Sequence, residues 1–213
     1  MMSPRIDAVE YAVPDAGVVA KAAAVLKDGG LVVAPTETRY GLLARADQPS
    51  AVSRLYSIKG RPVKLPTAIF VRDQRDISSY AVFNPAAKRL AERFLPGPLT
   101  LVLEATHDLG EPLVVDGKIG IRLSSAPFIK ALLKEVAFPV TATSANLSGT
   151  EDLDTVDEIA RAFGGKVDLY IDVGVLDNTV STVVDVSQEQ AVILREGAIA
   201  ADDIQQILKS QLI

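Results

Sequence analysis

The chain has 213 residues, and its 22 basic and 27 acidic side chains give a formal net charge of −5 at pH 7. Apolar residues make up 48% of it, a composition typical of globular proteins that excludes intrinsic disorder. The absence of cysteine excludes disulfides, thiolate catalysis, zinc–cysteine sites and iron–sulfur clusters. The sequence has no cationic leader followed by a long apolar stretch and no run of 18 apolar residues, so we expect a soluble cytoplasmic protein without membrane contacts.

The predicted elements alternate between helix and strand along the chain. Helices are expected at residues 17–26, 51–58, 85–94, 127–136, 156–163 and 202–208, with Asn84 capping the third of them. Strands are expected at 31–34, 67–71, 99–103, 140–143, 169–173, 182–186 and 192–194. Residues 113–115 and 119–123 predict a hairpin, because Asp116-Gly117 supplies the positive φ of a tight turn.

This order predicts one α/β domain with a twisted mixed sheet flanked by helices. The glycine-rich phosphate loops G-x-G-x-x-G and G-x-x-x-x-G-K-[ST] are absent, so a doubly wound nucleotide-binding fold is less favoured.

The charge is unevenly distributed along the chain. Residues 1–149 carry 18 Lys and Arg against 14 Asp and Glu, a net charge of +4, and residues 150–213 carry 4 against 13, a net charge of −9. Six basic residues and one acidic residue, Asp47, lie between Thr38 and Lys64: Arg39, Arg45, Arg54, Lys59, Arg61 and Lys64. This excess favours an anion site for a nucleotide, a phosphate or a tRNA backbone, and a solvated surface is the alternative.

Four polar segments lie at the ends of predicted strands or helices, where α/β folds gather ligand-binding groups. They are the segments 35–41 (PTETRYG), 59–62 (KGRP), 141–149 (TATSANLSG), and 181–185 (STVVD) with 194–197 (LREG). Each also has a structural interpretation: a turn bonded to its own backbone, cations at a helix C-terminus, a capping turn, and an edge-strand salt bridge.

Arg122 lies in an apolar predicted strand, where an unpaired charge would be costly. A carboxylate must therefore meet it, either an internal Asp or Glu or that of a substrate. Glu37 could serve as a base or metal ligand, although nothing in the spacing singles it out. His107, the only histidine, lies in a polar loop, which favours a surface role over Ser-His-Asp chemistry.

Seven motifs in one order make the chain resemble the YrdC/TsaC-like threonylcarbamoyl-AMP synthases. They are PTETRYGL, KGRP, FLPGPLTLVL, IGIRLS, TSANLSG, STVVDV and ILREGAI, and the likeness runs over residues 16–208. The resemblance implies the YrdC-like fold, also known as a double-stranded-RNA-binding domain, as a single domain over residues 1–213 without the additional C-terminal domain of longer members.

The resemblance also implies an activity and its site. The family makes L-threonylcarbamoyl-AMP from L-threonine, bicarbonate and ATP, releasing pyrophosphate, and a downstream threonylcarbamoyl-transferase complex then modifies tRNA adenosine. Lys59, Arg61, Ser144 and Asn146 match its catalytic constellation. Thr36, Thr38, Arg122 and Ser181 match threonine-binding positions, and Lys59, Arg61, Ser144 and Arg195 match ATP-binding positions. Mg²⁺ would be held mainly by the ATP phosphates, with no dedicated metal site in the protein.

The chain departs from the family pattern at four places: Leu43, Arg45, Leu65 and Phe70. The first two stand where many members have Gly and Asp, and the last two where they have Asn and His. Two alternatives to the synthase therefore stay open: a non-catalytic double-stranded-RNA or tRNA-binding module, and a YciO-like paralogue that binds nucleotide but performs a different reaction. The oligomeric state, monomer or homodimer, is not specified by the sequence.

Overall fold

Strands with alternating or continuous apolar residues hydrogen-bond into one sheet in the computed structural model, which describes residues 6–151, 153–176 and 179–209. In chain order they are β1 (Ile6–Ala8), β2 (Val32–Pro35), β3 (Tyr40–Leu43), β4 (Ala68–Phe70), β5 (Leu99–Glu104), β6 (Val114–Val115), β7 (Lys118–Arg122), β8 (Val140–Ser144), β9 (Leu169–Asp172), β10 (Thr182–Asp185) and β11 (Val192–Arg195).

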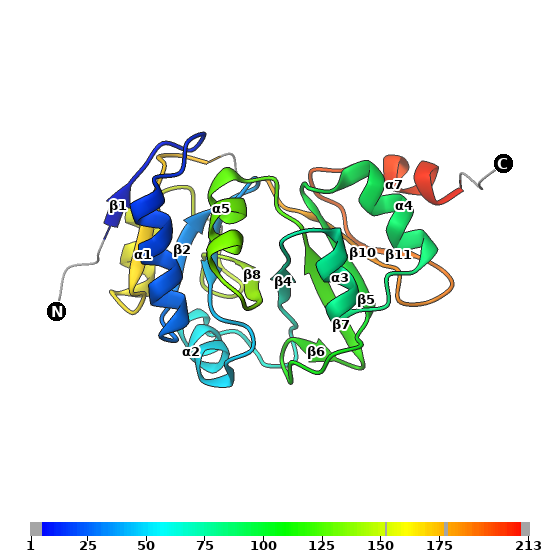
Figure 1. Cartoon of the computed structure of the whole chain (residues 1–213), viewed down its shortest axis with the longest axis horizontal. Coiled ribbons are helices and arrows are strands. Elements are labelled where there is room, and N and C mark those ends of the chain that lie inside the picture. The colour runs from blue at the N-terminus through cyan, green and yellow to red at the C-terminus, as the bar shows by residue number, and fades with distance from the viewer. Residues whose placement is uncertain (1–5, 152, 177–178, 210–213) are drawn as a thin grey trace.

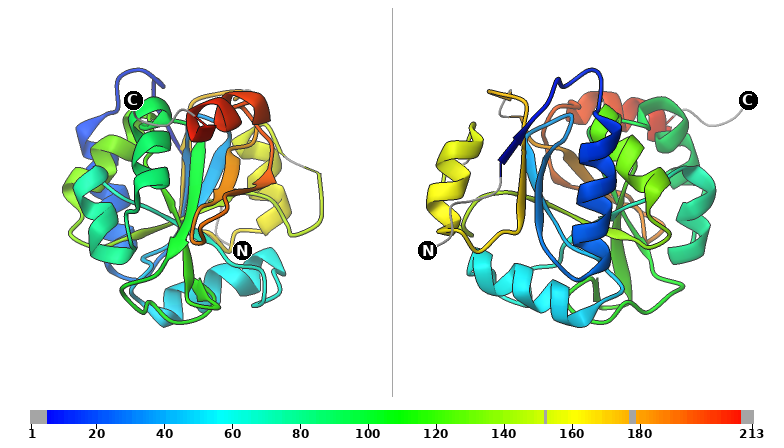
Figure 2. Two further views of the ribbon diagram at one scale, coloured as in Figure 1. Left: turned by 90° about the vertical axis from the view of Figure 1, so that its right-hand side faces the viewer. Right: turned by 60° about the vertical axis from the view of Figure 1, so that its left-hand side comes forward.

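The sheet has the strand order β1-β9-β2-β3-β8-β4-β7-β5-β10-β11, with β6 paired to β7. Four of its pairs are parallel, namely β1–β9, β2–β9, β4–β7 and β5–β10, and the other pairs are antiparallel. The predicted mixed sheet is confirmed, and the turned views of Figure 2 show its strong twist.

The helices are α1 (Ala16–Lys27), α2 (Pro49–Lys59), α3 (Gln74–Tyr80), α4 (Pro85–Phe94), α5 (Pro127–Glu135), α6 (Val156–Phe163) and α7 (Ala201–Lys209). Helices α1, α5, α3 and α4 lie on the near side of the sheet in Figure 1. Side-chain caps stabilise the N-termini of α4 and α6. Asn84 accepts a hydrogen bond from the Ala87 N–H at 2.9 Å, and Thr155 forms a capping box with Glu158.

Period-two alternation on the strands beside α3 and α4 gives the sheet two different faces. Leu99, Leu101 and Leu103 of β5 pack into the core with Leu90 of α4. The intervening residues of the same strands face the other way and line a cavity: Thr100 and Val102 of β5, Lys118, Gly120 and Arg122 of β7, and Ala68 and Phe70 of β4. The same strands therefore supply both the core and the floor of the site.

The structure confirms all of the predicted helices and strands and adds β1, β3 and α3, which the sequence pattern missed. The predicted hairpin turn is also confirmed, because Asp116 and Gly117 both have positive φ, at 52° and 70°. The sequence predicts a turn or loop over the polar segment 35–41, which includes the first two residues of β3. In the folded chain Tyr40 and Gly41 are buried and pair with Pro35 and Ala34 of β2.

Candidate active site

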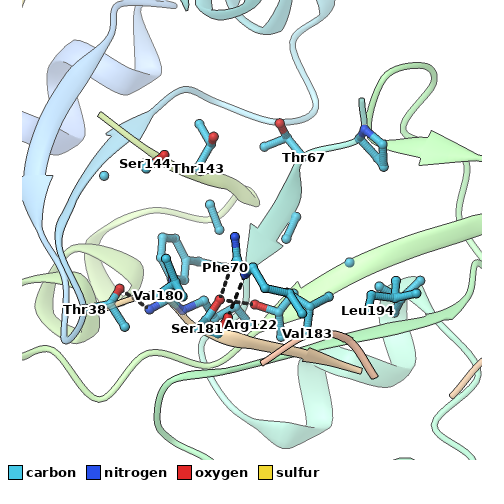
Figure 3. Close-up of a pocket in the computed structure, with 18 of the residues that line it drawn as sticks. Thr38, Thr67, Phe70, Arg122, Thr143, Ser144, Val180, Ser181, Val183 and Leu194 are labelled. Atoms are coloured by element: carbon cyan, nitrogen blue, oxygen red, sulfur yellow. Dashed lines mark hydrogen bonds between the residues drawn. The ribbon is translucent and has the colours of Figure 1, made fainter. Parts of the chain in front are cut away.

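One cavity of about 560 Å³ brings together polar residues from six strands and from the segments that connect them. Seven of the nine residues proposed from the sequence line it: Thr36, Thr38, Arg61, Arg122, Ser144, Ser181 and Arg195. Figure 3 shows several of them around the hollow, with Ser144 and Thr143 opposite Arg122 and Ser181. Segments that are far apart in the sequence, at residues 36–41, 100–122, 142–144 and 181–195, thus converge on a single site.

The cavity wall carries more cations than anions. The lining cations are Arg39, Arg61, Lys64, Lys118, Arg122 and Arg195, against two carboxylates, Asp116 and Asp185. Of the basic cluster noted in the sequence, three members lie here. Two others are engaged elsewhere: Arg45 with Asp47 at 2.6 Å, and Arg54 with Asp168 at 2.7 Å. The site as a whole favours an anionic ligand.

The 35–41 segment forms a tight turn held by Thr36. Its hydroxyl accepts from the N–H groups of Thr38 and Arg39, both at 3.2 Å, and donates to the Arg39 carbonyl at 2.7 Å. This is the self-bonded turn that the sequence offered as an alternative. Thr36 therefore shapes the loop, and Thr38 presents its hydroxyl 2.8 Å from Nη2 of Arg122.

Arg122 meets the internal carboxylate that its apolar strand requires, and that carboxylate is Glu37. The Nη2 and Nε atoms of Arg122 lie 2.8 and 3.2 Å from Oε1 of Glu37. Ser124 donates a hydrogen bond to Oε2 of Glu37, and the Phe70 ring lies 5.4 Å from the guanidinium carbon. The sequence did not single out Glu37, because no spacing signal links residues that lie 85 positions apart.

Ser181 and Arg195 form a second hydrogen-bonded arginine site, which lines the same cavity as Arg122. Arg195 donates from Nε to the Ser181 carbonyl at 3.0 Å and from Nη2 to its hydroxyl at 2.9 Å. The Ser181 hydroxyl also lies 3.0 Å from that of Thr100. Ser181 therefore orients Arg195 while lining the cavity itself.

Lys59 and Asn146 do not line the cavity. They lie behind Ser144, which forms part of the cavity wall. The Lys59 side chain is buried, and Nζ donates to the carbonyls of Ser144 at 2.5 Å and Asn146 at 2.7 Å. Asn146 in turn accepts from the Ser144 hydroxyl at 2.6 Å. The structure thus places Lys59 as an organiser of the 144–146 turn, and Ser144 as the member of this group that faces the cavity.

The loop after α2 carries Arg61 to the cavity mouth. Gly60 ends the helix with φ at 58°, a left-handed conformation that glycine adopts without strain. Arg61 donates from Nε to the Leu65 carbonyl at 3.0 Å and from Nη2 to the Pro66 carbonyl at 2.8 Å. Its guanidinium is therefore oriented before any ligand arrives.

The four departures from the family pattern fall at different depths. Phe70 lines the cavity floor, and Leu65 is 42% exposed in the loop beside Arg61. Leu43 is buried under α1 and α5, and Arg45 pairs with Asp47 and stacks 4.5 Å from the Phe138 ring centroid. Phe70 alone changes the lining of the site.

Asp185 and Lys118 form an ion pair across the floor, at 2.9 Å. Burial alone would raise the pKa of Asp185, but hydrogen bonds from Ser187 and Lys118 outweigh it and lower this pKa below its usual value. Asp185 is therefore an anion at neutral pH.

No group of three or more His, Cys, Asp or Glu side chains that could hold a metal ion occurs within residues 6–151, 153–176 and 179–209. In the same ranges, no helix combines the length and the apolar character needed to cross a bilayer.

Comparisons with known proteins agree with this geometry. The family model Sua5/YciO/YrdC, described as telomere recombination, matches residues 24–197. A relative from Methanocaldococcus jannaschii named putative threonylcarbamoyl-AMP synthase is 39% identical over 81% of this chain and 82% of its own length.

Two solved structures superpose closely. Pyrococcus abyssi Sua5 complexed with L-threonine has a TM-score of 0.87 and 32% identity, covering 96% of this chain. The present chain spans only 61% of that longer protein. Escherichia coli YciO also has a TM-score of 0.87, with 27% identity, and the match covers 94% of this chain and 99% of YciO.

Proposed function

Because the chain belongs to the Sua5/YciO/YrdC family, we propose that it is a nucleotidyltransferase that makes L-threonylcarbamoyl-AMP from L-threonine, bicarbonate and ATP, releasing pyrophosphate. The observation that carries this proposal is the cavity itself, where six cations and several hydroxyls surround about 560 Å³ of space. That volume lies in the range of ordinary small-molecule sites, and its charge suits an anionic substrate.

The chemistry needs positioning and charge stabilisation more than a nucleophilic side chain. The threonine amine first takes up carbon dioxide derived from bicarbonate to form a carbamate. A carbamate oxygen then attacks the α-phosphorus of ATP, and pyrophosphate leaves. Negative charge on the phosphoryl oxygens is met by preoriented cations, for which Arg61, Lys64 and Arg195 are the candidates on the cavity wall.

Arg122 is the candidate partner for the threonine carboxylate, because it lines the floor beside the hydroxyls of Thr38 and Ser181. Ser144 faces the same space from the opposite wall and is held by Asn146 and Lys59. The buried Lys59 ammonium therefore acts on the reaction through this turn. Thr36 fixes the loop that presents Thr38.

Mg²⁺ would accompany ATP as part of the substrate, held mainly by phosphate oxygens, where it would neutralise phosphate charge. Two carboxylates, Asp116 and Asp185, lie on the cavity wall, and Asp185 is paired with Lys118. The product would be consumed by a threonylcarbamoyl-transferase complex acting on tRNA.

The test is pyrophosphate release and adenylate formation from ATP and bicarbonate, measured with and without L-threonine. Product that requires both threonine and bicarbonate, and that forms more slowly with L-serine, supports the proposal. Failure to detect threonine-dependent product with ATP, Mg²⁺ and bicarbonate all present overturns it.

A YciO-like reaction is the second candidate, supported by the equal TM-score of 0.87 with E. coli YciO and by Phe70 on the cavity floor. It predicts ATP binding without threonine-dependent turnover in the same assay. Binding of RNA that weakens steeply with salt, without nucleotide binding, would instead indicate an RNA-binding module.

A further inference from the structure

Glu37 is a buried carboxylate beside the cavity for which the proposed reaction has no direct use. The Glu37 and Arg122 side chains are only 9% and 10% exposed, and Glu37 is not among the residues that line the cavity. Both of its oxygens are engaged by the protein, Oε1 by Arg122 and Oε2 by Ser124. Glu37 therefore reaches the site only through the arginine.

The bonds of Arg122 are made by two of its three guanidinium nitrogens. Nε donates to Glu37, and Nη2 donates to both Glu37 and Thr38. Among the residues that the structure describes, Nη1 has no hydrogen-bond partner, although Arg122 lines the cavity. The Phe70 ring supports the guanidinium plane from 5.4 Å, and Figure 3 shows both side chains at the floor of the site.

We propose that Glu37 is a positioning residue, which fixes the Nε–Nη2 edge of Arg122 so that Nη1 is presented to the carboxylate of the amino-acid substrate. This inference rests on the proposed function for the identity of that carboxylate. Charge-assisted bonds to a planar guanidinium set its orientation as well as its charge, and such supporting contacts govern how well a ligand-binding group is placed.

The arrangement also limits the number of hydrogen bonds that Arg122 can donate to a substrate carboxylate. A free guanidinium can clasp a carboxylate with two parallel N–H bonds, but here its Nε–Nη2 fork is already occupied by Glu37. The substrate carboxylate therefore bonds to Nη1, and other donors on the cavity wall complete its coordination. Orientation of the amino acid thus depends on Glu37 without direct contact to it.

Replacing Glu37 by Gln tests this idea. The amide keeps the size of the side chain but removes the charge that holds Arg122. We expect the KM for L-threonine to rise at least tenfold, while the KM for ATP stays within twofold, because only the amino-acid subsite is disturbed. Asp76→Asn is the matched control, since it removes a carboxylate from an exposed arginine pair, Arg72–Asp76, remote from the cavity.

A second readout does not depend on catalysis. In the ¹⁵N spectrum of the protein, the Nε–H signal of Arg122, identified by its loss in Arg122→Lys, should shift and exchange faster with solvent in Glu37→Gln. Ser124→Ala removes the hydroxyl that holds Oε2 and should shift the same signal by a smaller amount. It serves as the test if Glu37→Gln does not fold.

The two readouts separate this inference from the proposed function. An active wild-type enzyme whose KM for threonine is unchanged in Glu37→Gln overturns the positioning role and leaves the synthase standing. An inactive wild type overturns the synthase, and the Arg122 signal then decides the positioning role alone. An equal rise in the KM values for threonine and ATP would indicate a general structural role and also overturn the inference.

Discussion

Nζ of Lys59 lies 2.5 Å from the carbonyl oxygen of Ser144, so a buried cation at the end of α2 holds the turn that follows β8. The backbone joins the same two segments, because the Ser148 N–H donates to the Lys59 carbonyl at 2.8 Å. The α2 C-terminus and the 144–148 turn therefore behave as one unit. The cavity wall at Ser144 depends on this unit for its shape.

Substituting Lys59 by Met should accordingly lower both stability and activity. Methionine fills similar space but leaves the carbonyls of Ser144 and Asn146 without their buried donor, which costs about 2–4 kcal/mol of unfolding free energy. Urea unfolding measures the loss, and adenylate formation at a temperature where the variant is folded measures the activity.

Lys27→Met is the control for this change, because Lys27 is exposed at the end of α1 and should tolerate methionine within about 0.5 kcal/mol. Retention of full activity and stability in Lys59→Met would contradict the organising role of the ammonium.

Replacement of Arg61 by Ala should remove phosphate binding while leaving the fold intact. Arg61 donates to carbonyls of its own loop and lies over the Tyr56 ring, and it pairs with no carboxylate in the described part of the chain, so its loss leaves no buried charge. A phosphate contact made by arginine contributes about 1.5–3 kcal/mol, so the KM for ATP should rise about tenfold to a hundredfold. Steady-state kinetics measure the change, and thermal unfolding should move by no more than a few degrees.

Arg75→Ala provides the comparison, since its guanidinium is 93% exposed and pairs with Asp73 outside the cavity. If Arg61→Ala forms the adenylate as fast as wild type at low ATP, the assignment of Arg61 to the phosphates is wrong.

The sequence could predict most of the fold because the signals were local. Asn84 before Pro85 marks a helix start, Asp116-Gly117 marks a hairpin, and apolar runs such as residues 99–103 mark buried strands. The sequence pattern did not predict β3, because its first residues belong to a polar turn. The strand is defined by its pairing with β2 and β8. Pairing partners of this kind are not visible in a local pattern.

The candidate site was predictable to a similar degree and for a similar reason. Polar residues at strand ends indicated the segments that converge on the cavity, and seven of nine named side chains line it. The internal partner of Arg122 could be required on energetic grounds but not identified, since Glu37 meets it only in the folded chain. Likewise, the sequence did not show that Lys59 binds backbone carbonyls behind the wall.

Asp185 should make a pH-dependent contribution to stability. Its pKa is lowered in the folded chain, so its favourable bonds are fully present above the pKa of about 3.9 in the unfolded chain and are lost as the pH falls through the lower folded value. Because the pair is partly exposed, Asp185→Asn should cost about 0.5–1 kcal/mol at pH 7. That difference from wild type should shrink as the pH falls below about 4, which urea unfolding at several pH values will show.

Glu92→Gln is the control for the loss of one carboxylate, since Glu92 is exposed on α4 and has no hydrogen bond or ion pair in the described part of the chain. A constant difference between Asp185→Asn and wild type from pH 7 to pH 2.5 would argue against this contribution.

Gly197 follows β11 and lies against the backbone of residues 180 and 181, which precede β10. A side chain there should disturb the Ser181–Arg195 site. A Cβ atom at this position would lie 2.3 Å from the Val180 carbonyl oxygen, so the backbone at residues 180–181 must move. Gly197→Ala should therefore cost about 1–3 kcal/mol and raise the KM for ATP, because Ser181 orients Arg195.

Gly110→Ala separates these two effects of the Gly197 substitution. Gly110 has a φ of 74° but nothing within 4 Å of an added Cβ, so alanine there costs about 1–2 kcal/mol in backbone strain without a clash and away from the cavity lining. It should lose comparable stability while keeping the wild-type KM for ATP. Equal KM values in the two variants would show that the Ser181–Arg195 contact tolerates the displacement, and would remove the proposed link between this backbone approach and phosphate binding.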